Sequence, residues 1–250
     1  MFSRTMRVLF LTVAIFTMSN SPTSAMNYNT LYAEDSQSNL YTVHASTGAA
    51  TMVGSIGLVD VTDLAFRNSL LYGITFTQFL KIDPDTGSGI IIGDHGFTDL
   101  NALAVGPNGV IYSASNTTGD FLRIDSGTGQ GTLVGNFGPG LTCSGDLAFG
   151  SNGALYVSLN REGYENDWLG SVNLNTGSVT LIGDLGYDEV HGLSVRNGTL
   201  YGATESGQLL KIDANTGAGT ILGVSEVAYW GMATSPIRGQ TSPYLLLLLD

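Results

Sequence analysis

Four aspartates recur along this sequence at intervals close to the length of one repeat, and their spacing suggests shared chemistry. They are Asp63, Asp99, Asp146 and Asp188, each at or just before a short apolar run. If the chain closes into a ring, these carboxyl groups face a common axis. There they could bind a cation, or act as the acid and base of a glycosidase, which needs two carboxyl groups about 5 to 9.5 Å apart. The alternative is that each aspartate begins a strand and meets only water.

Aromatic residues form a second group with potential for binding. Both tryptophans and three tyrosines fall in or beside irregular segments: Tyr164, Trp168, Tyr187, Tyr229 and Trp230. Aromatic rings can stack on the apolar face of a sugar, because each ring combines a flat apolar surface with polar edges. This pattern predicts a site for a neutral oligosaccharide, with a basic peptide as the second choice. The alternative is that the tryptophans serve local packing.

Acidic neighbours of these rings, namely Asp99, Asp188 and Glu189, can accept hydrogen bonds from sugar hydroxyls and disfavour phosphates and sulfates. His191 is a candidate acid or ligand in the same region, or an ordinary polar loop residue. The sequence has no Gly-x-Ser-x-Gly, His-Glu-x-x-His or Cys-x-x-Cys motif. We therefore expect no cofactor and no metal, and predict a binding module. The alternative is a glycan-active enzyme, a glycosidase or lyase that uses axial carboxylates.

The segment that would position these residues is a hairpin that the chain repeats five times. Its clearest copy is FLKIDPDTGSGIIIG from Phe79, and variants begin at Asn39, Phe121, Leu169 and Leu209. Each copy has an alternating strand, a Thr-Gly turn, a second apolar strand and a closing glycine, which is the pattern of a β-hairpin.

Two further strands precede each hairpin, a Leu-Tyr strand and, before it, a large-small-large strand such as Leu64-Ala65-Phe66. Four strands in about 40 residues are typical of a propeller blade. The chain begins on a Leu-Tyr strand at Leu31 and ends on a large-small-large strand at Met232. The last strand therefore completes the first blade. We predict an all-β, five-bladed β-propeller of four antiparallel strands per blade, closed by its terminal strands.

The turn Ile-Asp-x-x-Thr-Gly, as at Ile82 to Gly87, resembles that of bacterial exported β-propellers with NHL-like, YncE-like and quinoprotein-like repeats. The resemblance covers Leu31 to Pro236 and implies the fold, not the chemistry. Quinoprotein dehydrogenases usually follow this turn with a tryptophan. Here the corresponding strand reads Ile90-Ile91-Ile92, so pyrroloquinoline quinone is not expected.

Composition and the chain ends predict an exported protein. Residues 1–25 look like a signal peptide, with Arg4 and Arg7 before the apolar run Val8 to Met18. The propeller domain then covers 26–236 and a tail covers 237–250, whose apolar end is too short to span a membrane. The chain has 21 acidic and 9 basic residues, which argues against nucleic acid and stable membrane insertion. We expect a secreted, periplasmic or cell-surface monomer. Cys143 is expected to be buried as a small hydrophobe, and the alternative is that it links two molecules.

Two irregular segments distinguish one face of the predicted ring. Residues 137–144 and the insertion 160–167 (NREGYEND) belong to the same blade, so we expect them to lie side by side. Binding sites collect on loops held by a rigid frame. Arg161, Tyr164, Glu165, Asp167 and Trp168 could then form the lip of a ligand site, or the insertion could be a tolerated surface loop.

Overall fold

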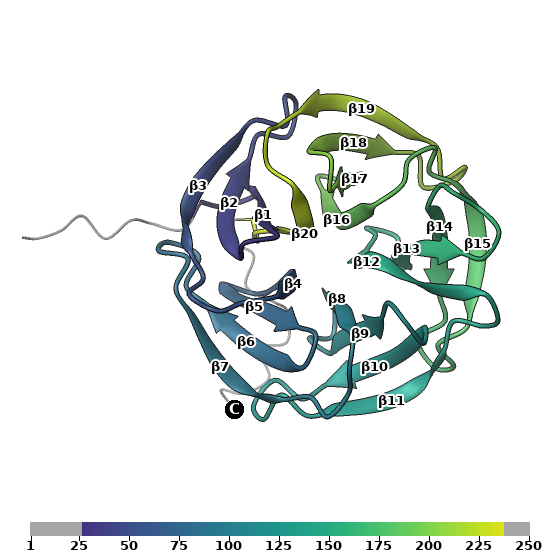
Figure 1. Cartoon of the computed structure of the whole chain (residues 1–250), viewed down its shortest axis with the longest axis horizontal. Helices are drawn as coiled ribbons and strands as arrows, with labels where there is room; N and C mark the ends of the chain where they lie inside the picture. Colours follow the sequence, from purple (N-terminus) through teal and green to yellow (C-terminus); the bar gives the residue numbers. More distant parts are fainter. Residues whose placement is uncertain (1–26, 238–250) are drawn as a thin grey trace, which may run out of the picture.

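The computed structural model describes residues 27–237 and confirms the five-bladed propeller. Twenty strands form five four-stranded antiparallel sheets, which are arranged as blades around a central axis (Figure 1). The signal peptide predicted for residues 1–25 and tail positions 238–250 lie outside the described residues. Within 27–237, no helix has the length and apolar character needed to cross a membrane.

Each blade runs from an innermost to an outermost strand in chain order, except the blade that joins the two ends. The innermost strands are β4 (Val61–Arg67), β8 (Leu100–Val105), β12 (Leu141–Phe149), β16 (Val190–Arg196) and β20 (Tyr229–Thr234). The second strands are β1 (Leu31–Asp35), β5 (Leu70–Thr75), β9 (Ile111–Ser115), β13 (Leu155–Arg161) and β17 (Thr199–Thr204). The third are β2 (Asn39–Val43), β6 (Gln78–Ile82), β10 (Asp120–Ile124), β14 (Trp168–Val172) and β18 (Gln208–Ile212). The outermost are β3 (Ala50–Ser55), β7 (Gly89–Asp94), β11 (Gly131–Asn136), β15 (Val179–Asp184) and β19 (Gly219–Val224).

The closing blade has the order β20-β1-β2-β3, as the order of the repeats predicts. Strand β20 pairs antiparallel with β1 through Leu31↔Thr234, Ala33↔Met232 and Glu34↔Gly231. This pairing covers the strand edge that would otherwise be open on β1.

Hydrophobic cores lie between neighbouring blades. The tyrosines of the Leu-Tyr strands are buried in four blades, and Tyr72 stacks on Phe79 with 5.1 Å between ring centroids. Only small side chains stand at the middle of the innermost strands, because the blades converge there. These residues are Ala65, Ala104, Ala148, Ser194 and Ala233.

The closing glycine of each hairpin has a packing role between blades. A Cβ at Gly135 on β11 would overlap the carbonyl oxygen of Thr176, in the Thr-Gly turn of the next blade. The same contact recurs around the ring at Gly54 with Thr86, Gly93 with Thr128, Gly183 with Thr216 and Gly223 with Thr47. The last of these pairs crosses the closing seam. Each turn thus abuts the outermost strand of the preceding blade, which explains why the glycine recurs in every repeat.

Candidate functional site

Two of the predicted aspartates meet on the axis of the ring. Asp63 of β4 and Asp146 of β12 occupy equivalent positions on their strands, two residues before the central alanine. Both have no exposed surface. Oδ1 of Asp63 lies where a Cβ of Gly231 would stand, and Asp146 accepts from the N–H of the next residue, Met232, so the two carboxyl groups share one buried site. The blades that carry them are separated by one blade, so the two side chains bridge the centre of the ring.

These two carboxyl groups accept hydrogen bonds from all five innermost strands. Asp63 accepts from the backbone N–H of Leu64 at 2.6 Å and of Leu103 at 2.5 Å. Asp146 accepts from the N–H groups of Leu147 at 2.5 Å, Leu193 at 2.5 Å and Met232 at 3.3 Å. The inner edge of each innermost strand would otherwise leave these donors unpaired. Two side chains therefore join five blades.

A third carboxyl group, Glu34 of β1, reaches the same place and was not predicted from the sequence. Its Cα partner across the ladder is Gly231, where an added Cβ would meet both Oε1 of Glu34 and Oδ1 of Asp63. The missing side chain at Gly231 thus lets Glu34 approach the axis. Glu34 has no exposed surface, and neither carboxyl oxygen has a hydrogen-bond partner. We refer to Glu34, Asp63 and Asp146 as the axial hub.

A sequence signal for Glu34 existed. The residue two positions after the repeated tyrosine is Ile74, Ala114, Ser158 or Ala203 in the other four blades. An acidic residue at a position that is elsewhere apolar or small is an exception to the repeat, and exceptions of this kind mark special positions.

Burial raises the pKa of all three carboxyl groups well above its ordinary value. The negative charge of Asp146 raises the pKa of Glu34 and Asp63 further, whereas the hydrogen bond from Asp63 lowers that of Asp146. The hub has no surface through which a glycoside could reach it. Its geometry therefore does not support the glycosidase alternative.

The other two predicted aspartates are not partners in the hub. Asp99 lies just before β8 with a positive φ of 59° and accepts a hydrogen bond from the hydroxyl of Thr117 at 3.2 Å. Asp60 and Glu189 occupy the equivalent positions before β4 and β16, with φ of 57° and 51°. These three acidic residues form left-handed turns at the strand starts. Asp188 is exposed in the same turn as Glu189.

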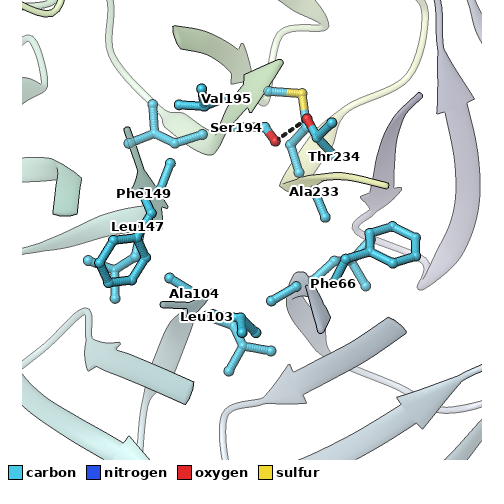
Figure 2. A pocket seen from close by; sticks show the side chains of 15 residues that line it. Phe66, Leu103, Ala104, Leu147, Phe149, Ser194, Val195, Ala233 and Thr234 are labelled. Carbon is cyan, nitrogen blue, oxygen red and sulfur yellow. Dashed lines mark hydrogen bonds between the residues drawn. The ribbon is translucent and has the colours of Figure 1, made fainter. Parts of the chain in front are cut away.

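A narrow cavity runs along the axis beside the small residues of the innermost strands (Figure 2). Its volume is about 130 Å³, and Leu103, Ala104, Ser194 and Ala233 are among its lining residues. Pockets for organic ligands usually span about 300 to 1,000 Å³. The axial cavity is smaller than this range, so we do not assign a sugar to it.

A larger hollow, of about 600 Å³, lies between the two irregular segments. Its walls come from residues 117–118 and Asn136, from 138–142, and from 160–164, and we call it the insert groove. The N–H of Glu162 donates to the carbonyl of Gly140 at 2.9 Å and so links the two segments. The prediction that they lie side by side is confirmed.

Three residues of the predicted lip form one stack at this groove. The guanidinium carbon of Arg161 lies 4.1 Å from the ring centroid of Tyr164 and 4.3 Å from that of Trp168. The two rings meet edge to face at 5.2 Å. The guanidinium of Arg161 makes no hydrogen bond or ion pair within residues 27–237, and Tyr164 is 53% exposed.

Asp167 ties the insertion to the next blade. Its Oδ2 accepts from the hydroxyl of Ser144 at 2.6 Å and from the N–H of Val190 at 2.7 Å. Burial raises its pKa to about 6, although these hydrogen bonds act in the opposite direction. Its role is to hold β12, the insertion and β16 together.

The remaining predicted residues lie on neighbouring blades. Tyr229 is fully buried, and its hydroxyl donates to the carbonyl of Gly48 at 3.0 Å, so its ring is not available at the surface. Trp230 is half-buried on β20, with an indole N–H that is buried and unpaired. His191 lies 4.0 Å from Glu205, and burial lowers the pKa of its imidazole.

Residues 27–237 contain no group of three or more histidine, cysteine or acidic side chains suited to hold a metal ion. The repeated turn aspartates cap their own turns, as Asp83 does when it accepts from the N–H of Asp85 at 2.9 Å. Cys143 is buried, and burial raises the pKa of its thiol well above its ordinary value. The expectation of a buried thiol is confirmed.

Comparison with known proteins identifies the repeat but not the activity. Residues 88–233 match a family model described as a repeat of unknown function. No curated protein matches the chain. One similar solved structure is titled "The de novo evolutionary emergence of a symmetrical protein is shaped by folding constraints". It has 18% identity and a TM-score of 0.54, and the match covers 83% of this chain and 98% of that one.

Another similar structure is titled "Crystal structure of Nidogen/Laminin Complex". It has 11% identity and a TM-score of 0.55, and the match covers 82% of this chain and 83% of the other. At such low identity, both similarities show the propeller fold alone.

Proposed function

The chain belongs to the DUF6923 family of repeats of unknown function, and we propose that it is a binding module whose insert groove binds a neutral oligosaccharide. The volume of the groove, about 600 Å³, falls within the range of ligand sites. Export to the periplasm, the cell surface or the medium, and a monomeric state, are part of the proposal and rest on the sequence.

The observation that carries this proposal is the state of Arg161. Its guanidinium lies over the rings of Tyr164 and Trp168, which are in contact with each other, while its N–H donors have no protein partner in the described chain. A stacked guanidinium is a planar set of donors held in place before the ligand arrives, so little side-chain freedom is lost on binding. Tyr164 adds an exposed ring for stacking beside these donors.

The charge of the groove favours a neutral ligand. Arg161 and Glu162 are its only charged lining residues, so their formal charges cancel in a chain whose net charge is −12. The other polar side chains are hydroxyls and amides, namely Thr117, Thr118, Asn136, Thr142 and Asn160. Sugar hydroxyls both donate and accept hydrogen bonds, and this set can satisfy both.

A binding assay on an array of neutral oligosaccharides, with the protein that begins at Met26, tests the proposal. We expect Tyr164→Ala to weaken binding about fivefold, because the stacking lost is worth about 1 kcal/mol. Arg161→Lys should also weaken binding, since lysine keeps the charge but loses the planar donor fork. Leu133→Ala is the control, because Leu133 is equally exposed, at 52%, on an outermost strand.

Two results would refute the proposal. One is that the parent protein retains no neutral glycan. The other is that Tyr164→Ala binds as tightly as the parent and the Leu133→Ala control.

A further inference from the structure

We propose that the axial hub is a proton-binding site: the five blades close around at least one bound proton, and removal of that proton at alkaline pH loosens the ring. This inference does not depend on the proposed function of the insert groove. It rests on the contacts of Glu34, Asp63 and Asp146.

The shared burial of Asp63 and Asp146 requires the first proton. Both carboxyl groups are fully buried beside Gly231 and Met232, and two carboxyl groups in one buried site without a cation cannot both be ionised. One of them is therefore protonated and can donate to the other, which only accepts. Asp146 accepts from three backbone N–H groups and Asp63 from two. Since more donors favour the ionised form, Asp146 is the anion and Asp63 holds the proton.

Glu34 is an independent observation that points to the same chemistry. Its carboxyl group is fully buried, is directed at the hub, and has no hydrogen-bond partner for either oxygen. An ionised carboxylate in such a place would lose its hydration without any compensating donor. Glu34 is therefore neutral and holds a second proton.

No basic side chain neutralises the hub. The other titratable residues of the six strands around it are Tyr32 and Asp35 on β1, Cys143 on β12, His191 on β16 and Tyr229 on β20. Arg67 and Arg196 lie at the opposite ends of β4 and β16, where they bond to Ser126 and Asn29. The lowered pKa of His191 keeps that imidazole neutral. Protons are thus the only positive charge that the described strands offer to the hub.

The bound proton has a specific mechanical role. Asp63 ties β4 to β8, and Asp146 ties β12 to β16 and β20. The hydrogen bond between the two aspartates joins these two groups of blades across the axis. Loss of the proton from Asp63 replaces that bond by repulsion between two buried carboxylates. The strands β4 and β8 should then separate from β12, β16 and β20 at the centre of the ring.

Infrared spectroscopy detects the protons directly. The native chain at neutral pH should show the carbonyl band of a buried, protonated carboxylic acid that does not exchange readily with solvent. Glu34→Gln should remove part of this band, and Asp94→Asn should leave it unchanged, because Asp94 is exposed at the end of β7. This readout requires only that each variant is folded at the pH of the measurement.

Unfolding in denaturant at several pH values tests the effect on the ring. Each proton released on unfolding makes the unfolding equilibrium constant rise by up to tenfold per pH unit. Glu34→Gln mimics the protonated acid and breaks no hydrogen bond. The unfolding equilibrium constant of this variant should therefore rise with pH less steeply than that of the parent, by up to a factor of ten per pH unit. Both proteins carry Asp167→Asn, which removes the separate titration of that residue. Absence of the band, or an equal pH dependence with and without Glu34→Gln, overturns the proposal.

Discussion

Burial and hydrogen-bond donors together set the pKa of a carboxyl group in this chain. Asp125 is exposed in a Thr-Gly turn, and hydrogen bonds from the Thr128 hydroxyl and from two backbone N–H groups lower its pKa. Asp167 has two donors but is buried, and its pKa is raised. Glu34 is fully buried without a donor from any other residue, and burial raises its pKa well above its ordinary value. Identical chemical groups thus serve as a turn cap, a link between loops and a proton holder.

Asp167→Asn should stabilise the protein at neutral pH. The folded state raises the pKa of Asp167 from 3.8 to about 6, so the folded protein binds this proton more tightly than the unfolded chain does. The contribution of the protonated Asp167 to the free energy of unfolding is fully present below pH ~4 and is lost as the pH rises through about 6. The total loss is ~3 kcal/mol. Asparagine cannot ionise, and its carbonyl oxygen can still accept from Ser144 and Val190.

Urea unfolding at pH ~4.5 and ~7.5 measures this effect. The free energy of unfolding of Asp167→Asn should exceed that of the parent more at the higher pH. A difference between the two proteins that stays constant with pH would contradict the assignment.

At the scale of the element, the hairpin and the contact between blades are encoded together. The Thr-Gly turn needs a left-handed residue, and Gly177 has a φ of 75°. The same turn packs against the closing glycine of the preceding blade, as Thr176 does against Gly135. One repeated motif therefore sets both the turn and the position of the next blade.

Gly135→Ala should destabilise the propeller by ~1–3 kcal/mol, because the new methyl group would overlap the backbone of Thr176 and force the blades apart. Gly127→Ala is the matched control. Gly127 lies in an exposed turn without a positive φ, and an added Cβ would meet only Oδ1 of Asp125 at 3.5 Å. Thermal melting of both variants gives the comparison. Equal melting temperatures would show that the blades adapt without cost.

The repeat made the blades and the closure by β20 predictable from the sequence. The proximity of residues 137–144 and 160–167 followed from their membership of one blade. The hub was only half predicted, since Asp63 and Asp146 were expected at the axis but Glu34 was not. Its position depends on Gly231, some 200 residues away in the chain, and on a strand pairing that no local pattern contains. The burial of Tyr229 depends likewise on a partner, Gly48, from the opposite end of the sequence.

At the scale of the whole molecule, two sets of contacts hold the blades together, one near the rim of the ring and one at its centre. Near the rim, the glycine contacts join each blade to its neighbour. At the centre, the hub joins innermost strands of all five blades. Both systems include the closing blade, since Gly223 of β19 meets Thr47 at the rim and Met232 of β20 donates to Asp146 at the axis. Closure is thus a property that no single blade possesses.

Deletion of the chain from Gly231 onward should abolish the closed monomer. The truncation removes most of β20, and with it the backbone partners of Leu31 to Glu34 on β1 and one of the three donors to Asp146. It also uncovers Tyr32, which is only 1% exposed in the intact ring, beside an unpaired strand edge. Exposed edges of this kind pair with other chains, so the truncated protein should form oligomers or aggregates in size-exclusion chromatography. A chain that ends at Ile237 keeps all of β20 and should elute and melt like the full-length protein, which separates loss of the strand from loss of the tail. If the shorter chain also remained monomeric with an unchanged melting temperature, β20 would not be needed to close the ring.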